Sequence, residues 1–215
     1  MTVYLIGGPP RCGKTTVARH LARATASAWL QTDYLEAAFA AYAHPDGLAP
    51  PQLALPDEVP HGRRNDALYA RYSATDIIAY YRALAGQTWA GLRPIIEYAL
   101  FDDEPLILEG FHLDPSDIRR WLAKSDARYP GQVRPIFVVR EDPAGIEAAL
   151  HRGDHRNDWV LTKTQDAATF TRIARMIAEY GAMIRAEAEQ GGFAVFGTDG
   201  DFAQQLENIV AQQMA

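Results

Sequence analysis

Several things are scarce in this sequence. Cys12 is the one cysteine among 215 residues, so no disulfide can form within the chain, which favours a reducing compartment. No run of about 18 apolar residues occurs, and no basic stretch followed by an apolar one opens the chain, so we expect neither a membrane span nor a targeting segment. Basic residues are not in excess, since the net charge is −6 and the pI is 5.5, which argues against a nucleic-acid partner. We therefore expect a cytoplasmic protein without membrane or nucleic-acid partners.

Length and composition favour one folded unit. A chain of 215 residues is long for one small domain and short for two, and its 48% hydrophobic content can fill a sizeable core. We expect a single domain over residues 1–215 that carries insertions.

The stretch Gly8–Thr15 matches the pattern G-x-x-x-x-G-K-[ST]. It follows an apolar run at residues 3–6 and opens a segment with helical spacing from Val17, which is the strand, loop and helix context that a phosphate-binding loop requires. Glycines let backbone N–H groups turn toward phosphate oxygens, and the helix N-terminus adds partial positive charge. Lys14 is expected to reach the β- and γ-phosphates and Thr15 to bind magnesium. The predicted nucleotide-binding residues are Gly8, Pro9, Pro10, Arg11, Cys12, Gly13, Lys14, Thr15 and Thr16.

Cys12 lies inside this loop, near the N-terminus of a helix. That position favours a thiolate, so bound nucleotide is expected to shield a reactive sulfur. The alternative is a small apolar side chain that fills space.

Two carboxylates follow predicted strands. The run 28–31 reads as a strand that ends at Thr32-Asp33, and residues 105–108 form an apolar strand that delivers Glu109 into a glycine turn. Functional groups of open α/β sheets gather at the carboxyl ends of strands. Asp33 therefore either acts on an acceptor hydroxyl or caps a helix that begins at residue 34. Glu109 is predicted to serve magnesium or the substrate, and the alternative is a structural carboxylate.

Residues 34–101 read as a helical insert that binds the acceptor. A proline-rich loop over 44–64 ends in Arg63 and Arg64, which either clamp an anionic substrate or lie in solvent. Ser73 to Asp76 predicts a capping box for a helix that Gly86 ends, and a further helix over 88–101 is interrupted at Pro94.

The second half of the chain supplies further candidates. His112 follows Glu109 in a loop and is either a substrate-binding or a packing residue. Residues 151–165 read as a lid whose Arg152 and Arg156 neutralise charge on a transferring phosphoryl group, the alternative being an exposed polar loop. Strands are expected at 133–139 and 193–196 and helices at 165–190 and after 201, so Thr198 lies in a loop that either touches the adenine base or merely turns the chain.

Together these features resemble the adenylate-kinase-like branch of P-loop phosphotransferases. The resemblance rests on Gly8–Thr15, Asp33, the helical insert, the lid and the loop at Thr198. Residues 109–115 are similar to the E-G-x-H-L-x-P stretch of 2-phosphoglycerate-kinase-like proteins, and zeta-toxin relatives carry an aspartate in the place of Asp33, where it acts on the substrate hydroxyl. The resemblance implies a three-layer α/β sandwich with a five-stranded parallel sheet in the order 2-3-1-4-5. It also implies ATP at the loop and an acceptor between insert and lid.

The expected function is transfer of the γ-phosphoryl group of ATP, with Mg²⁺, to a hydroxyl of a small anionic metabolite. Lys14, Asp33, Arg152 and Arg156 are the expected catalytic residues. Asp33, Arg63, Arg64, Glu109 and His112 are expected to contact the acceptor, and Thr15 and Glu109 the metal. A nucleoside monophosphate kinase is one alternative. A nucleotide-binding switch that hydrolyses ATP slowly is another.

Overall fold

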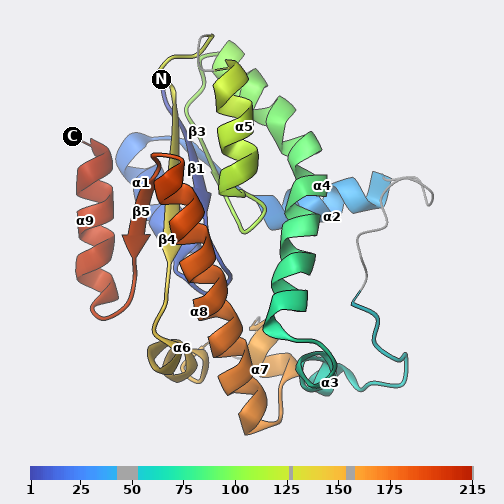
Figure 1. The fold of residues 1–215 in the computed structure, drawn as a ribbon. Helices are drawn as coiled ribbons and strands as arrows, with labels where there is room; N and C mark the ends of the chain where they lie inside the picture. Colours follow the sequence, from blue (N-terminus) through green and yellow to red (C-terminus); the bar gives the residue numbers. More distant parts are fainter. Residues whose placement is uncertain (43–52, 126–127, 154–157, 215) are drawn as a thin grey trace.

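The computed structural model of the protein describes residues 1–42, 53–125, 128–153 and 158–214. Its centre is a parallel sheet with the strand order β2-β3-β1-β4-β5, which confirms the expected topology. Figure 1 shows this sheet in the middle of the molecule, with helices on both of its faces. The strands are β1 (Val3–Gly7), β2 (Ala28–Gln31), β3 (Leu106–Glu109), β4 (Val133–Val139) and β5 (Ala194–Gly197).

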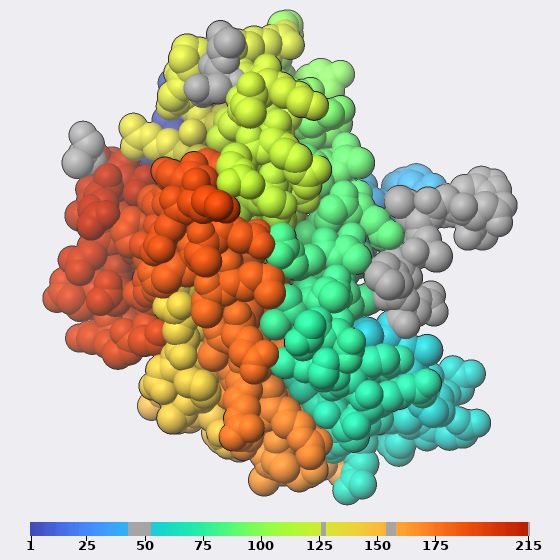
Figure 2. All heavy atoms as spheres, in the orientation of Figure 1, coloured from blue at the N-terminus to red at the C-terminus, as the bar shows by residue number. Residues whose placement is uncertain are grey.

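The helices form the two outer layers of a three-layer sandwich. On one face, α1 (Lys14–Thr25) packs on β1, β2 and β3 and against α9 (Phe202–Met214). On the other face, α4 (Ala74–Phe101) and α8 (Ala167–Gln190) pack on the sheet and on each other, and α5 (Pro115–Ser125) packs on α8. The space-filling view shows α4 and α8 in contact on the visible face (Figure 2). No helix in the described ranges is long and apolar enough to cross a membrane.

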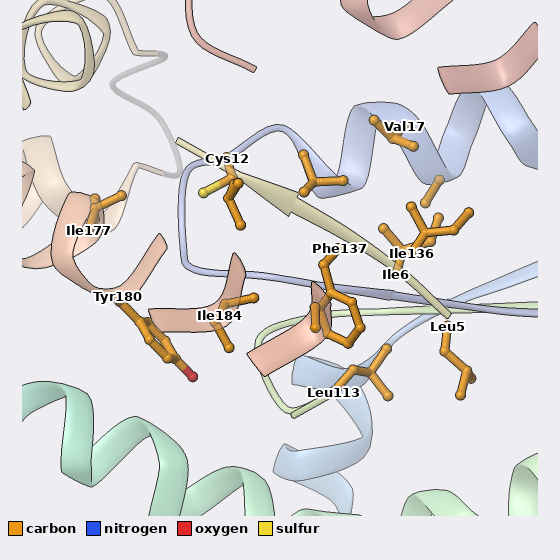
Figure 3. Packing of buried hydrophobic residues seen from close by; sticks show 14 of the residues in the cluster. Leu5, Ile6, Cys12, Val17, Leu113, Ile136, Phe137, Ile177, Tyr180 and Ile184 are labelled. Atoms are coloured by element: carbon orange, nitrogen blue, oxygen red, sulfur yellow. The ribbon is translucent and has the colours of Figure 1, made fainter. Parts of the chain in front are cut away.

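The central strands are apolar because both of their faces are covered. β1 and β3 are buried along their whole length, which is typical of parallel strands between two helical layers. Figure 3 shows Phe137 of β4 in this core, with Leu113 near it and Tyr180 of α8 further along. The buried centre holds the carboxyl ends of the strands in fixed positions.

The strands point toward the end of the molecule where α3 (Arg64–Arg71), α6 (Pro143–Leu150) and α7 (Trp159–Lys163) lie (Figure 1). The helix α2 (Thr32–Tyr42) begins directly after β2 at this edge and packs on α4. A short 3₁₀ turn, η1 (His61–Arg63), precedes α3. The functional residues predicted from the sequence follow the strands at this edge.

The prediction that Gly86 ends one helix is wrong, and so is the prediction that a helix restarts at Pro94; the alternative, a kink at Pro94, stays a prediction. The helix α4 runs without a break from Ala74 to Phe101, although its capping box forms as expected. The Ser73 amide donates to Asp76 at 2.9 Å and the Asp76 amide donates to the Ser73 hydroxyl at 3.2 Å. A helical glycine costs only about 1 kcal/mol, and the buried face of α4 outweighs that cost.

Two other boundaries differ from those expected. Because α2 begins at Thr32, Asp33 lies inside the first helical turn and does not cap a helix that starts at Tyr34. Within the segment 151–165, the structure contains the helix α7, which the sequence did not indicate. Its N-cap is Asp158, whose carboxylate accepts from the Val160 amide at 2.9 Å. Residues 43–52, which include the first part of the proline-rich loop over 44–64, and residues 154–157 lie outside the described ranges.

Candidate active site

The phosphate-binding loop needs glycine at both of its ends. Gly8 has φ 134° and Gly13 has φ 90°, a region that favours glycine. A Cβ atom at Gly8 would run into the carbonyl oxygen of Val138, and one at Gly13 would lie 2.5 Å from the ring of Phe202. The loop therefore folds tightly against β4 and α9. These close approaches explain why the sequence pattern has glycine at positions 8 and 13.

Lys14 lies buried at the start of α1 and folds back over this loop. Its Nζ donates to the carbonyl oxygen of Pro9 at 2.6 Å. Beside it is a cavity of about 300 Å³. Two more cations, Arg11 and Arg140, line this cavity, so its charge suits an anionic ligand. The other lining residues are Gly13, Thr15, Thr16, Ile146, Ala149 and Leu150.

Thr15 and Glu109 face each other across the end of the sheet. The Thr15 hydroxyl donates to Glu109 Oε1 at 2.8 Å, and the Gln31 amide donates to the same oxygen at 3.0 Å. Glu109 is only 3% exposed. Two oxygen ligands fit Mg²⁺, which takes one or two protein oxygens and completes its shell with phosphate oxygens and water. The described residues contain no group of three or more His, Cys, Asp or Glu that would hold a metal without a bound nucleotide.

Asp33 follows β2 at the carboxyl edge of the sheet, in the first turn of α2, with its side chain 65% exposed. Loss of surrounding water raises the pKa of this carboxyl above its ordinary value, and the charge of Lys14 opposes that rise. The lysine is thus near enough to act on Asp33 electrostatically. A solvent-exposed carboxylate at this edge of the sheet, within the electrostatic influence of the loop lysine, suits a group that accepts a proton from a substrate hydroxyl.

His112 lies completely buried below Asp33. Its Nδ1 is 2.8 Å from the Thr32 hydroxyl and 3.7 Å from Asp33, and its Nε2 is 3.2 Å from a carboxylate oxygen of Glu36. Burial and the positive charge of Lys14 lower the pKa of His112 to about 4, so the ring is neutral at neutral pH. His112 contacts the carboxylates of α2 from below and is not itself open to a substrate.

Of the four arginines predicted to bind the acceptor or the transferring phosphoryl group, three lie in the described ranges. Arg63 donates to the Gln165 side chain at 2.8 Å, and Arg64 lines a separate hollow. Arg152 is exposed beyond the end of α6, and Arg156 lies outside the described residues. The segment 151–165 contacts the phosphate-binding loop through a different arginine, Arg11 of the loop itself. Arg11 forms an ion pair of 2.7 Å with the buried Asp158.

Cys12 does not behave as its position in the loop suggested. It is 1% exposed, its thiol lies 3.6 Å from the Pro10 carbonyl oxygen, and burial raises its pKa to about 11. The expectation of a favoured thiolate is therefore wrong, because loss of solvent outweighs the neighbouring positive charges. Figure 3 shows Cys12 among the buried apolar side chains.

Thr198 contacts the phosphate-binding loop through its side chain. Its hydroxyl is buried and lies within hydrogen-bond distance of the carbonyl oxygens of Cys12, at 2.9 Å, and Val139, at 3.2 Å. These contacts tie the loop after β5 to the phosphate-binding loop. The proposed contact with an adenine base remains a prediction.

Sequence reasoning missed two residues of this site, Glu36 and Arg140. A signal existed for each. Glu36 is three residues after Asp33 and thus on the same face of a helix, and Arg140 directly follows β4 at the carboxyl edge.

Comparison with known proteins gives the fold. No family model matches the sequence, and no curated protein matches it. The solved shikimate kinase of Bacteroides thetaiotaomicron superposes with a TM-score of 0.56 at 11% identity, covering 99% of this chain and 96% of that one. The chain therefore has the fold of this shikimate kinase, with the expected strand order 2-3-1-4-5. This confirms the resemblance at the level of architecture.

Other solved kinases superpose more loosely. The deoxyadenosine kinase of M. mycoides, solved with bound dATP, gives a TM-score of 0.48 at 11% identity over 100% of both chains. The shikimate kinase of Acinetobacter baumannii, solved with shikimate, gives 0.46 at 13% identity over 99% of this chain and 92% of that one. These two likenesses are too distant to support any inference about the site.

Proposed function

We propose that this protein is an ATP- and Mg²⁺-dependent kinase that transfers the γ-phosphoryl group to a hydroxyl of a small molecule. One observation carries the proposal. The carboxyl edge of the sheet brings together the loop lysine Lys14, the Thr15–Glu109 oxygen pair at 2.8 Å and the exposed carboxylate of Asp33. Phosphoryl transfer needs a phosphate cradle, ligands for the metal and a group that orients the attacking hydroxyl.

Each group has a separate task. The loop amides and Lys14 bind the β- and γ-phosphates, and Arg11 and Arg140 add positive charge around the same cavity. Thr15 and Glu109 hold Mg²⁺, which when bound neutralises charge on the phosphate oxygens. Asp33 accepts a hydrogen bond from the acceptor hydroxyl, orients it toward the γ-phosphate and takes its proton.

The acceptor that we propose carries an anionic group away from the reacting hydroxyl. Support comes from a hollow of about 620 Å³ whose lining includes the cations Arg64 and Lys163. Tyr80 and the carboxylate of Asp57 line the same hollow, and burial and the charge of Glu36 on α2 raise the pKa of Tyr80. In this proposal Arg63, Arg152 and Arg156 stabilise charge around the closed site.

A coupled ADP-release screen tests the function. Acceptors would be grouped by charge and would include shikimate, D-gluconate, 2-phosphoglycerate and nucleoside monophosphates, with neutral sugars and amino alcohols beside them. We expect ADP release that depends on one group of anionic hydroxyl compounds. Turnover with neutral or cationic acceptors only would contradict the anionic class. Turnover with nucleoside monophosphates only would favour a nucleotide kinase, and slow acceptor-independent hydrolysis would favour a switch.

A further inference from the structure

Arg11, inside the phosphate-binding loop, has an unusual backbone conformation. Its φ is 65°, in the left-handed region that an L side chain rarely adopts, and such a conformation persists only where the surroundings hold it. The side chain lines the cavity beside Lys14 and is 31% exposed. Its Nη2 lies 2.7 Å from the carboxylate of Asp158. A residue from outside the loop thus contacts the loop cation.

Asp158 is fixed in place. Its side chain is 2% exposed, and Oδ1 accepts from the Val160 amide at 2.9 Å as the N-cap of α7. Its carbonyl oxygen accepts from the Thr162 hydroxyl at 2.8 Å. Oδ2 has no hydrogen-bond partner among the described residues, so the nearby charge of Arg11 compensates this buried oxygen. Asp158 therefore serves as a rigid anchor for the guanidinium.

The helix that Asp158 caps is itself held to the rest of the molecule. The side-chain amide of the buried Asn65 donates to the Trp159 carbonyl oxygen at 3.2 Å and to the Thr164 hydroxyl at 3.0 Å. Val160, in the first turn of α7, is completely buried. These contacts at both ends of α7 keep Asp158 from following a movement of Arg11.

Gly153 lies against the ion pair. A Cβ atom at this position would run into Oδ2 of Asp158 and lie 2.9 Å from Nη2 of Arg11. The backbone after α6 therefore encloses the pair, and glycine leaves the space that the two side chains occupy.

The position of Arg11 suits it to bind phosphate. A guanidinium presents five N–H groups in a rigid fork that matches phosphate oxygens. The side chain of Arg11 makes no hydrogen bond to the described chain, so these donors are available to a ligand in the cavity. A long side chain that is held before the ligand arrives loses less freedom on binding, which raises affinity.

We infer that Asp158 is a positioning residue of the nucleotide site, which holds Arg11 where it binds the phosphates. This inference rests on the proposed function and deepens it, because it makes the phosphate contact of Arg11 depend on α7. Asp158 acts through Arg11 and does not itself touch the nucleotide.

A double-mutant cycle tests this inference by calorimetry with Mg²⁺ and the non-hydrolysable ATP analogue AMP-PNP. Arg11→Met should weaken binding about tenfold in the unmodified protein, because it removes charge-assisted contacts to phosphate. In the Asp158→Asn background the same change should cost about twofold or less, because Arg11 is no longer held. Asp158→Asn also removes a negative charge, but that effect is common to both backgrounds and cancels in the comparison.

The cycle has a matched control in Asp166, which caps α8 through the Ala168 amide at 3.0 Å as Asp158 caps α7. In the Asp166→Asn background Arg11→Met should keep its full effect. Magnesium tripolyphosphate, which lacks the nucleoside, should give the same coupling between Arg11 and Asp158. Melting temperatures check that every variant is folded.

Gly153→Ala disturbs the pair without changing any charge. It should weaken AMP-PNP binding about three- to tenfold by displacing the guanidinium, and should add nothing to the effect of Arg11→Met. A merely structural effect of the added methyl group would lower affinity equally in both backgrounds.

The outcomes separate this inference from the proposed function. An equal cost of Arg11→Met with Asp158 and with Asn at position 158 overturns the inference even if ADP is released in the acceptor screen, and so does a coupling that tripolyphosphate does not show. The expected coupling without ADP release supports the inference and counts against the kinase. Failure of both probes to bind the unmodified protein contradicts the nucleotide site, and with it both proposals.

Discussion

The two sides of the proposed active site are built in different ways. The nucleotide side is one continuous stretch, Gly8–Thr15, closed by glycines, and its cavity is lined by Arg11, Lys14 and Arg140. The proposed acceptor side is assembled from α2, α4 and the loop after β3, and α2 contributes the carboxylates Asp33 and Glu36 to it. A continuous motif is readable from the sequence, whereas a site assembled from separate segments needs the fold.

The opposite charges of the two sides agree with the direction of transfer. Cations around the phosphates stabilise negative charge on the moving group, and a carboxylate opposite them takes the proton of the attacking hydroxyl. Of Asp33 and Glu36, Asp33 is the carboxyl whose pKa the charge of Lys14 lowers. The nucleotide side and the acceptor side therefore meet at Lys14 and Asp33.

The largest effect is expected on the nucleotide side. Lys14→Ala removes the cation nearest the loop and should lower acceptor-dependent ADP release by about 10³–10⁵-fold, the range seen when a cation that stabilises a transferring phosphoryl group is lost. The fold should persist, since Lys14 contacts only the Pro9 carbonyl oxygen among the hydrogen bonds of the described chain. Circular dichroism and melting temperature check the fold, with Lys124→Ala, an exposed lysine, as control. Near-normal transfer in Lys14→Ala would mean that the active site lies elsewhere.

The next prediction separates the two sides through their carboxylates. Asp33→Asn should lower kcat by about 10²–10⁴-fold with little change in the Kd of MgATP, because the carboxylate acts on the acceptor. Glu109→Gln should instead raise the Mg²⁺ concentration needed for half-maximal activity. Steady-state kinetics at varied Mg²⁺ and calorimetry with MgATP measure these changes. If Asp33→Asn lost tenfold or more in MgATP affinity, Asp33 would belong to the metal site. The nucleotide side and the acceptor side would then share this residue.

A third prediction concerns the chemistry of the loop itself. The pKa of Cys12 is raised from its ordinary 9.0 to about 11 by burial, and only the thiolate reacts with alkylating agents. Two pH units correspond to an approximately 100-fold smaller thiolate fraction at pH 8. Alkylation by iodoacetamide at pH 8 should therefore be at least about 100-fold slower in the folded protein than in urea, and should accelerate as the pH rises toward 11. Fast alkylation at pH 7 that MgATP suppresses would contradict this prediction and would show that Cys12 is a reactive thiolate in the loop.

The outcome for Cys12 shows where sequence reasoning reaches its limit. The strand order and the positions of the loop, Asp33 and Glu109 follow from local patterns, because a parallel sheet places the ends of its strands at one edge. Burial depends on the whole fold, so the pKa of Cys12 was misjudged from its neighbours in the chain. The same holds for α4: Gly86 locally predicts the end of a helix, but packing of the buried face of α4 keeps the helix intact through that position.

The acceptor side was least predictable for the same reason. The approach of His112 Nε2 to the Glu36 carboxylate, at 3.2 Å, brings together residues 76 positions apart in the chain, and it occurs because β2 and β3 are neighbours. Arg63 and Arg64 follow a loop whose course no local pattern determines, so their role as a substrate clamp stays a prediction. In the structure Arg63 donates to the Gln165 side chain, and Arg64 lines a separate hollow.

The smallest effects are expected on α4, the helix that carries the acceptor-side wall. At Gly86 the nearest atom that an added Cβ would meet is a carboxylate oxygen of Asp117 at 4.0 Å, so Gly86→Ala should stabilise the protein by about 0.5–1 kcal/mol through helix propensity alone. At Gly91 the Cβ would lie 2.5 Å from the ring of Phe39 on α2, so Gly91→Ala should destabilise by about 1–3 kcal/mol and shift α2 against α4. Because α2 carries Asp33 and Glu36, Gly91→Ala should also raise the KM for the acceptor several-fold while the Kd of MgATP stays constant. Urea denaturation and kinetics of both variants measure this, and an equal change in both constants in Gly91→Ala would show that the two sides are not separable.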